Sequence, residues 1–435
     1  MVDIERKELY MNRNIKLSPS IVALTWDVIF VWTITTLYFT SVKGLTNSQI
    51  VWLDSILMLF GCIFCVPVGK LFQNIKSTTA IRIGLFGYAA YLLLCIFGTN
   101  YFTFIFAQPF LAFGYAIMSV KVNTFLNQSL ANVKRDKDYQ KIYGKGLSVY
   151  YVIECIGAIL ITYVYNWKPY MVYWIALIIV GITLILTTLL KEPSKYMESN
   201  VNLTATSTKQ VNKKPDSFKK IINSGFLISM LVYCFFYRGI LSVTGSAYRI
   251  YLNELIFTNT IPLWSFGYFY ALSRLCAAIS SKFQFKFNLK FGLRSLLIFN
   301  VVVVLGYVGV GIFYLINPTS IIGIIIIVIL SCLLCAVRLP NQIFINNYLQ
   351  VCTHKRNVER VYSIRTMVEY LGYALISFVF SGLLSLYNDN FGLTCLTYIG
   401  IFAIPLIISL IFFIKQLTKK YAQKYTIVKD EYVND

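Results

Sequence analysis

The chain has 435 residues and a formal net charge of +21. Hydrophobic residues make up 57% of it, charged residues only 13%, and the mean hydropathy is +0.67. A soluble protein of this length needs far more charged surface. The composition therefore excludes a soluble domain and predicts an all-α integral membrane protein. No nucleic-acid partner is expected, because the basic excess is explained by membrane topology.

Twelve apolar stretches have close to the roughly 20 residues with which a helix crosses a bilayer. They lie at about 19–40, 49–68, 81–99, 102–122, 147–165, 169–190, 224–245, 262–281, 295–316, 320–339, 363–385 and 392–414. A basic, Ser/Thr/Asn-rich stretch separates six of these spans from the other six. The predicted parts are an N-terminal six-helix half at 1–190, a cytoplasmic linker at 191–223, a C-terminal six-helix half at 224–415 and a cytoplasmic tail at 416–435.

Basic residues alternate with the spans. The predicted inside segments hold 31 of the 39 lysines and arginines, whereas the predicted outside loops hold only Lys43, Lys168 and Arg249. By the positive-inside rule, both termini are expected in the cytoplasm. The high Lys, Asn and Ile content favours a bacterial cell (cytoplasmic) membrane. We expect a multi-pass monomer whose partners are the lipid bilayer, a small-molecule substrate and protons.

The two halves share a short internal repeat. Residues 144–161 match residues 359–376 at a constant offset of 215. Four pairs carry the match: Lys145 with Arg360, Ser148 with Ser363, Glu154 with Glu369, and Gly157 with Gly372. Both copies run in the same direction across the membrane, which predicts a parallel repeat of six-span halves.

This arrangement resembles the major facilitator superfamily. The loop Gly69–Gly84 is similar to the superfamily's G-x-L-x-D-R-x-G-R-K motif at Gly69 and Leu71, although Gln73 stands at the Asp position. The resemblance implies twelve transmembrane helices in two pseudo-symmetric halves, and a secondary transporter that works by alternating access. Phe104 replaces an Arg that members often carry in span 4, and the antiporter Gly-Pro cluster of span 5 is missing. The direction of transport and the coupling ion therefore stay open.

Charged groups in hydrocarbon are costly, so each needs a partner, water or a function. Arg82 lies only at the inside edge of the third span, and nine such residues lie in the apolar bodies of the spans: Asp27, Asp54, Lys121, Glu154, Arg238, Arg274, Arg338, Arg365 and Glu369. In the superfamily fold, spans 1, 4, 7 and 10 line the central cavity, spans 2, 5, 8 and 11 pack beside them, and the remaining spans face lipid. All nine residues fall in the first two groups, as the resemblance implies.

Six of the nine are candidates for the substrate or proton pathway: Asp27, Glu154, Arg238, Arg274, Lys121 and Arg338. Asp27 is the first candidate for the proton carrier and Glu154 the second, because a proton-coupled cycle needs a carboxyl group whose surroundings change. Arg238 and Arg274 lie deep in their spans. They are expected to bind an anionic group or to pair with Asp27 or Glu154.

Structural roles compete with these functions. Lys121 and Arg338 lie towards the cytoplasmic ends of their spans, where they would equally well snorkel to lipid phosphates. Asp54, together with Arg365 and Glu369, is a candidate for gating or for a salt bridge between the halves. Arg365 and Glu369 are four residues apart, and this spacing favours simple mutual neutralisation.

No His cluster, paired catalytic motif, metal-ligand spacing or GxxxxGK[ST] motif is present. We therefore expect no enzyme activity, cofactor or metal, and protons are the favoured energy source. The acid-to-base asymmetry favours an amphipathic or anionic substrate, with a slight preference for efflux. Proton-coupled uptake of a sugar or organic acid is the alternative. A non-transporting membrane sensor or assembly partner is the alternative from another class, and the short tail disfavours it.

Overall fold

The computed structural model describes residues 2–72, 75–135, 138–193, 225–352 and 358–433. Within these ranges the chain forms thirteen α-helices and no strand, which confirms the all-α prediction. The helices are α1 (Val2–Thr25), α2 (Val31–Ser41), α3 (Asn47–Leu71), α4 (Ser77–Phe97), α5 (Tyr101–Asn132), α6 (Tyr139–Trp167), α7 (Met171–Thr188), α10 (Gly225–Phe257), α11 (Ser265–Phe291), α12 (Arg294–Ile316), α13 (Ile321–Cys352), α14 (Val358–Leu386) and α15 (Phe391–Val433).

Ten of these described helices are long and apolar enough to cross a membrane, so the protein is a multi-pass membrane protein. The two predicted spans without such a helix are the first and the eighth. The first is divided between α1 and α2, and the eighth lies in α11, whose polar residues lower its hydropathy. The count of twelve transmembrane helices therefore stays a prediction.

Contacts divide the chain into two compact units. The first holds α1 to α7 together with Leu252–Leu275, and the second holds the rest of α10 and α11 together with α12 to α15. The predicted C-terminal half, 224–415, includes 252–275 instead. Most of the predicted linker, 194–223, lies outside the described residues. The predicted domain boundaries therefore remain a prediction.

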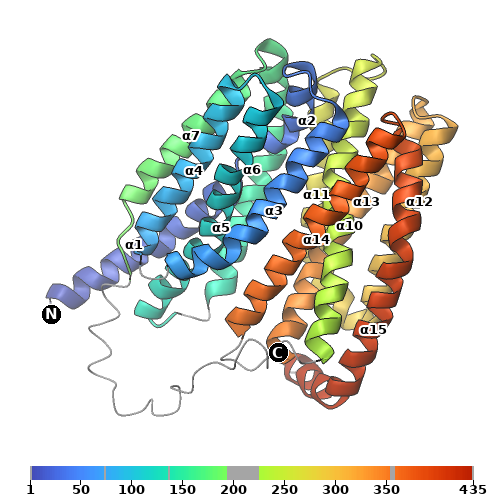
Figure 1. The fold of residues 1–435 in the computed structure, drawn as a ribbon. Coiled ribbons are helices and arrows are strands. Elements are labelled where there is room, and N and C mark those ends of the chain that lie inside the picture. The colour runs from blue at the N-terminus through green and yellow to red at the C-terminus, as the bar shows by residue number, and fades with distance from the viewer. Residues whose placement is uncertain (1, 73–74, 136–137, 194–224, 353–357, 434–435) are drawn as a thin grey trace. The chain divides into compact units, whose positions relative to one another are not determined.

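Small residues bring the helices of the first unit close together. Helix α4 lies beside α5 and α7, while in the second unit α12 lies beside α13 and α15 (Figure 1). A Cβ at Gly87 in α4 would come within 2.8 Å of the carbonyl oxygen of Phe110 in α5. Because lipid is as apolar as leucine, helices in a bilayer associate through such close packing.

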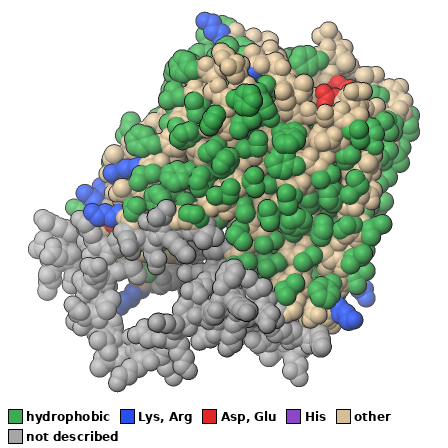
Figure 2. Space-filling view, viewed as in Figure 1, with side chains coloured by type: hydrophobic (Ala, Val, Ile, Leu, Met, Phe, Trp, Pro, Cys, Tyr) green, Lys and Arg blue, Asp and Glu red, His purple; other side chains and the backbone are tan. Residues whose placement is uncertain are grey.

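Apolar side chains are exposed at helical spacing on two helices that are expected to face lipid. They include Ile178, Ile182 and Ile185 on α7, and Ile404, Ile408 and Ile411 on α15. Hydrophobic side chains are also spread over the described part of the face seen in Figure 2, where most visible lysines and arginines lie near the edges. A water-soluble surface rarely carries such continuous apolar patches, whereas acyl chains cover them in a bilayer.

The segment after α7 is held against the start of α4. The Glu192 carboxylate accepts hydrogen bonds from the backbone N–H groups of Ser77, at 3.2 Å, and Thr78, at 3.0 Å. These N–H groups have no partner within the helix, and a carboxylate at this end also complements the helix dipole. The first residues of the predicted linker thus cap a helix of the first unit.

The two glycines of the internal repeat make equivalent contacts, each within its own unit. A Cβ at Gly157 in α6 would overlap the ring of Phe30, which precedes α2 in the first span. A Cβ at Gly372 in α14 would overlap the carbonyl oxygen of Phe235 in α10, the seventh span. The fifth span thus packs on the first span, and the eleventh span packs on the seventh.

We predict that Gly372→Ala lowers the thermal unfolding temperature, because a backbone carbonyl cannot move aside as a side chain can. Overpacking of this kind costs about 1–3 kcal/mol. Gly382→Ala on the same helix is the matched control, since no described atom lies within 4 Å of a Cβ there. Unfolding of the purified protein in detergent measures both variants. Equal melting temperatures would show that the α10–α14 approach is not tight.

Candidate functional site

The first candidate site is a break in the first predicted span. Helix α1 ends at Thr25, α2 begins at Val31, and Phe30 between them has a φ of 73°. Bulky residues rarely adopt this left-handed conformation, and it persists only where surrounding contacts enforce it. The sequence predicts one continuous helix over 19–40. The break is therefore a difference from that expectation.

Protein groups satisfy the backbone of this break. The Tyr88 hydroxyl donates to the carbonyl oxygen of Thr25 at 3.3 Å. The Val28 N–H donates to Asp27 Oδ1 at 2.7 Å, and the Phe30 N–H donates to Glu154 Oε1 at 3.2 Å. Irregular backbone at membrane depth is tolerated only where protein or a water-filled cavity supplies such partners. Both first-half carboxylates predicted for the proton pathway thus meet at one place.

Asp27 is held by three hydrogen-bond donors on a single oxygen. Its Oδ1 accepts from the Val28 N–H, from the Trp32 indole N–H and from the Tyr115 hydroxyl. Hydrogen bonds to an ionised carboxylate are roughly twice as strong as neutral ones. These donors stabilise the ionised form of Asp27, which burial opposes, and fix the carboxylate in one position.

Glu154 has fewer partners. Its side chain is fully buried, and its Oε2 has no hydrogen-bond partner among the described residues. A buried polar atom without a partner is costly. A proton, a water molecule or a ligand group at Oε2 would offset this cost.

Arg274 completes this group from α11. Its guanidinium lies 4.7 Å from the centre of the Tyr270 ring and donates to the Tyr270 hydroxyl. Its charge acts on both Asp27 and Glu154, although within the described residues no ion pair joins it to either. The structure thus brings together three residues of the predicted pathway.

A glycine on α11 lets this helix approach the carboxylates. A Cβ at Gly267 would overlap the carbonyl oxygen of Ala158, one turn beyond Glu154 on α6. This close approach places the following turns of α11, including Arg274, beside α6. The contact belongs to the first unit, which includes Leu252–Leu275.

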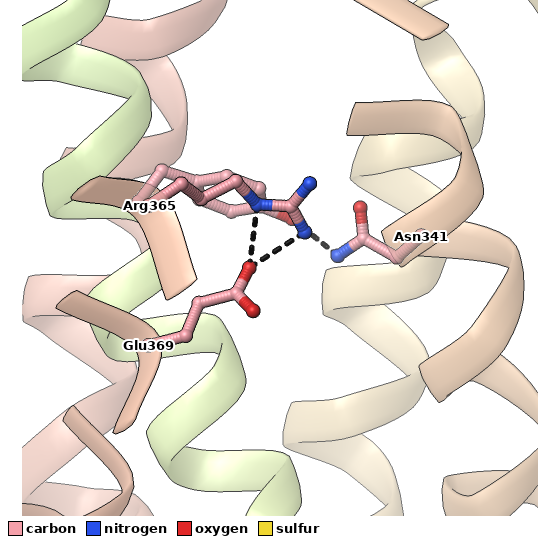
Figure 3. A network of polar contacts seen from close by, with 4 residues as sticks. Asn341, Arg365 and Glu369 are labelled. Carbon is pink, nitrogen blue, oxygen red and sulfur yellow. Dashed lines mark hydrogen bonds and ion pairs between the residues drawn. The ribbon is translucent and has the colours of Figure 1, made fainter. Parts of the chain in front are cut away.

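A second group of predicted residues lies in the second unit. Arg238, Arg338, Arg365 and Glu369 line a pocket of about 270 Å³. Arg365 binds Glu369 through Nε and Nη2, each 2.6 Å from Oε1, as the i, i+4 spacing predicts (Figure 3). Asn341 on the facing helix points towards this pair and donates to the Tyr233 hydroxyl at 3.0 Å.

The remaining two predicted residues lie elsewhere. Lys121 donates from Nζ to the carbonyl oxygen of Ile75 at 3.0 Å, just before α4 begins. Asp54 is buried in α3, near Tyr91. Within the described residues, no group of three His, Cys, Asp or Glu side chains could hold a metal ion.

Sequence reasoning missed Trp32 and Tyr115, the two side chains that hold Asp27. Trp32 reaches the carboxylate only because the span is broken between them, and Tyr115 comes from α5. In the sequence, only their chemistry points to this role, because the indole N–H and the phenol O–H are hydrogen-bond donors within apolar spans.

Comparison with known proteins extends this picture. The sequence matches the family model described as Major Facilitator Superfamily over residues 17–377. Two crystal structures of the nucleoside transporter NupG share the fold. The structure of a NupG point mutant has a TM-score of 0.69 and 15% identity, covering 92% of this chain and 99% of that one. The other NupG structure has a TM-score of 0.70 and 14% identity, covering 94% and 99%. No curated protein matches this sequence.

We predict that Asp27→Asn lowers the stability of the purified protein. Hydrogen bonds to charged groups contribute about 1.5–3 kcal/mol, so losing the charge should lower the melting temperature by several degrees. Asp138→Asn is the control, because Asp138 forms an exposed ion pair with Arg135 at 2.7 Å, of a kind that contributes about 0–1 kcal/mol. If Asp27→Asn and Asp138→Asn have the same melting temperature, the break between α1 and α2 does not depend on the charge of Asp27.

Proposed function

Because this chain belongs to the Major Facilitator Superfamily and is a secondary transporter, we propose that it couples the movement of a small molecule to protons through Glu154. The observation that carries this proposal is the buried Glu154 Oε2, which has no hydrogen-bond partner among the described residues. Burial and the charge of Arg274 act on this carboxyl group in opposite directions. A group under such opposed influences is suited to bind and release a proton as its surroundings change.

The geometry supports different roles for the two carboxylates. Protonation of Asp27 Oδ1 would weaken three hydrogen bonds at once, whereas Glu154 accepts only the bond from Phe30. We therefore assign proton transfer to Glu154 and support of the helix break to Asp27. This reverses the order in which the sequence alone ranks them.

The substrate is proposed only as a class. The sequence favours efflux of an amphipathic or anionic compound, with uptake of a sugar or organic acid as the alternative. The NupG structures are those of a nucleoside transporter, so nucleosides are included in the substrate panel. At 14–15% identity this likeness supports the fold alone.

The membrane placement is also proposed. The distribution of basic residues supports cytoplasmic termini and a cell-membrane location. We also propose that the protein acts as a monomer, and its division into two contact units supports alternating access by a rocking motion.

We predict that a pH gradient drives substrate flux in proteoliposomes and that Glu154→Gln abolishes this response. Substrate exchange without a gradient should persist in Glu154→Gln, because the variant cannot change its charge but keeps the acceptor for the Phe30 N–H. A panel of drugs, sugars, organic acids and nucleosides identifies the substrate. Normal gradient-driven flux in Glu154→Gln would rule out the proposed role.

Two further variants sharpen this measurement. Asp138→Asn should transport like the wild type, since its carboxylate lies in an exposed ion pair. Asp27→Asn should lose stability while the fraction that remains folded stays coupled. If Asp27→Asn instead uncouples fully stable protein, Asp27 is the proton carrier. Absence of any flux across the panel would favour the non-transporting alternative.

A further inference from the structure

The pocket in the second unit is built from three helices. Arg238 comes from α10, Arg338 from α13, and Arg365 with Glu369 from α14. Three guanidinium groups and one carboxylate therefore line about 270 Å³ of space. The described residues that line the pocket leave two positive charges in excess.

The one carboxylate is already engaged. Glu369 Oε1 accepts a hydrogen bond from Arg365 Nε and forms an ion pair with Arg365 Nη2, and both side chains are almost fully buried (Figure 3). By contrast, no described side chain forms a hydrogen bond or an ion pair with Arg238 or Arg338. The charges of Arg338 and Glu369 both act on Arg238, so these groups lie within electrostatic range of one another.

The single described carboxylate of the pocket cannot balance three guanidinium groups, and an excess of positive charge within transmembrane helices is costly. Charged groups at this depth pair with each other, contact water or bind a ligand. Two arginines also repel each other, and the Glu369 carboxylate serves mainly Arg365. An anion between Arg238 and Arg338 would balance their positive charge and offset the repulsion between the two guanidinium groups.

We propose that this pocket binds an oxyanion, either a carboxylate or a phosphate group. Guanidinium groups match both anions through paired N–H donors. Gln342 also lines the pocket and offers an amide donor, whereas the Tyr237 hydroxyl already donates to the carbonyl oxygen of Val337 at 3.2 Å.

Two sources can supply this chemistry. If the anion is a solute, the inference rests on the proposed function and makes the substrate a small organic acid or phosphate ester. The predicted span within α13 ends at about residue 339, close to Arg338, so an anionic lipid headgroup is the other source. Both sources require the same two arginines. The test therefore has one arm that asks whether the arginines bind an anion and a second arm that identifies the source of that anion.

The first arm uses the purified full-length protein in an uncharged detergent. Succinate and inorganic phosphate are titrated at constant ionic strength while thermal unfolding is followed. We expect a saturable rise in melting temperature, and at least tenfold weaker binding in Arg238→Gln and Arg338→Gln. Arg294→Gln is the matched control, because Arg294 is exposed at the start of α12, and it should bind like the wild type. Arg338→Lys keeps the charge and should bind with intermediate affinity.

The second arm uses nanodiscs of phosphatidylcholine with or without phosphatidylglycerol. Stabilisation by phosphatidylglycerol alone, lost in both Gln variants, would identify a lipid headgroup as the oxyanion. The proposal is overturned if no probe stabilises the protein, or if the Gln variants respond like Arg294→Gln. These measurements need no gradient, so failure of the Glu154 coupling test would leave their outcome unaffected.

Discussion

Water is missing from the bilayer core, so each backbone N–H, carbonyl and charge there must find its partner within the protein or its ligands. This constraint explains why a break in the first span lies among acids and phenols. Tyr88 takes the carbonyl freed at Thr25, while Asp27 and Glu154 take the exposed N–H groups. The same constraint applies to the pocket of the second unit, because three arginines line it and only one described carboxylate is present to balance their charge.

The internal repeat shows how two equivalent positions acquired different chemistry. Glu154 and Glu369 occupy matching places, one turn before glycines that pack on the first helix of their own unit. Glu154 binds backbone at the helix break and lies near Arg274, whereas Glu369 is held by Arg365 on its own helix. One copy leaves a carboxylate oxygen available, and the other has its charge neutralised.

Much of the fold could be predicted from sequence because the length of each apolar span and the placement of basic residues can be read from short stretches of the chain. The Arg365–Glu369 pair was predictable for the same reason, since one helix sets its geometry. The break at 26–30 was not, because the residues WDVIF contain no Gly or Pro. The contact of Lys121 with Ile75 depends on the conformation of a loop, and the contact of Tyr115 with Asp27 depends on how two helices pack. The spacing of residues in the sequence reveals neither.

The contact between Phe30 and Gly157 has a consequence for how this chain can change over time. The ring occupies the volume that any side chain at 157 would need. A larger residue at 157 becomes tolerable only after the residue at 30 has become smaller, so the order of substitutions matters. Substitutions at these two positions, which are 127 apart in sequence, are therefore expected to depend on each other.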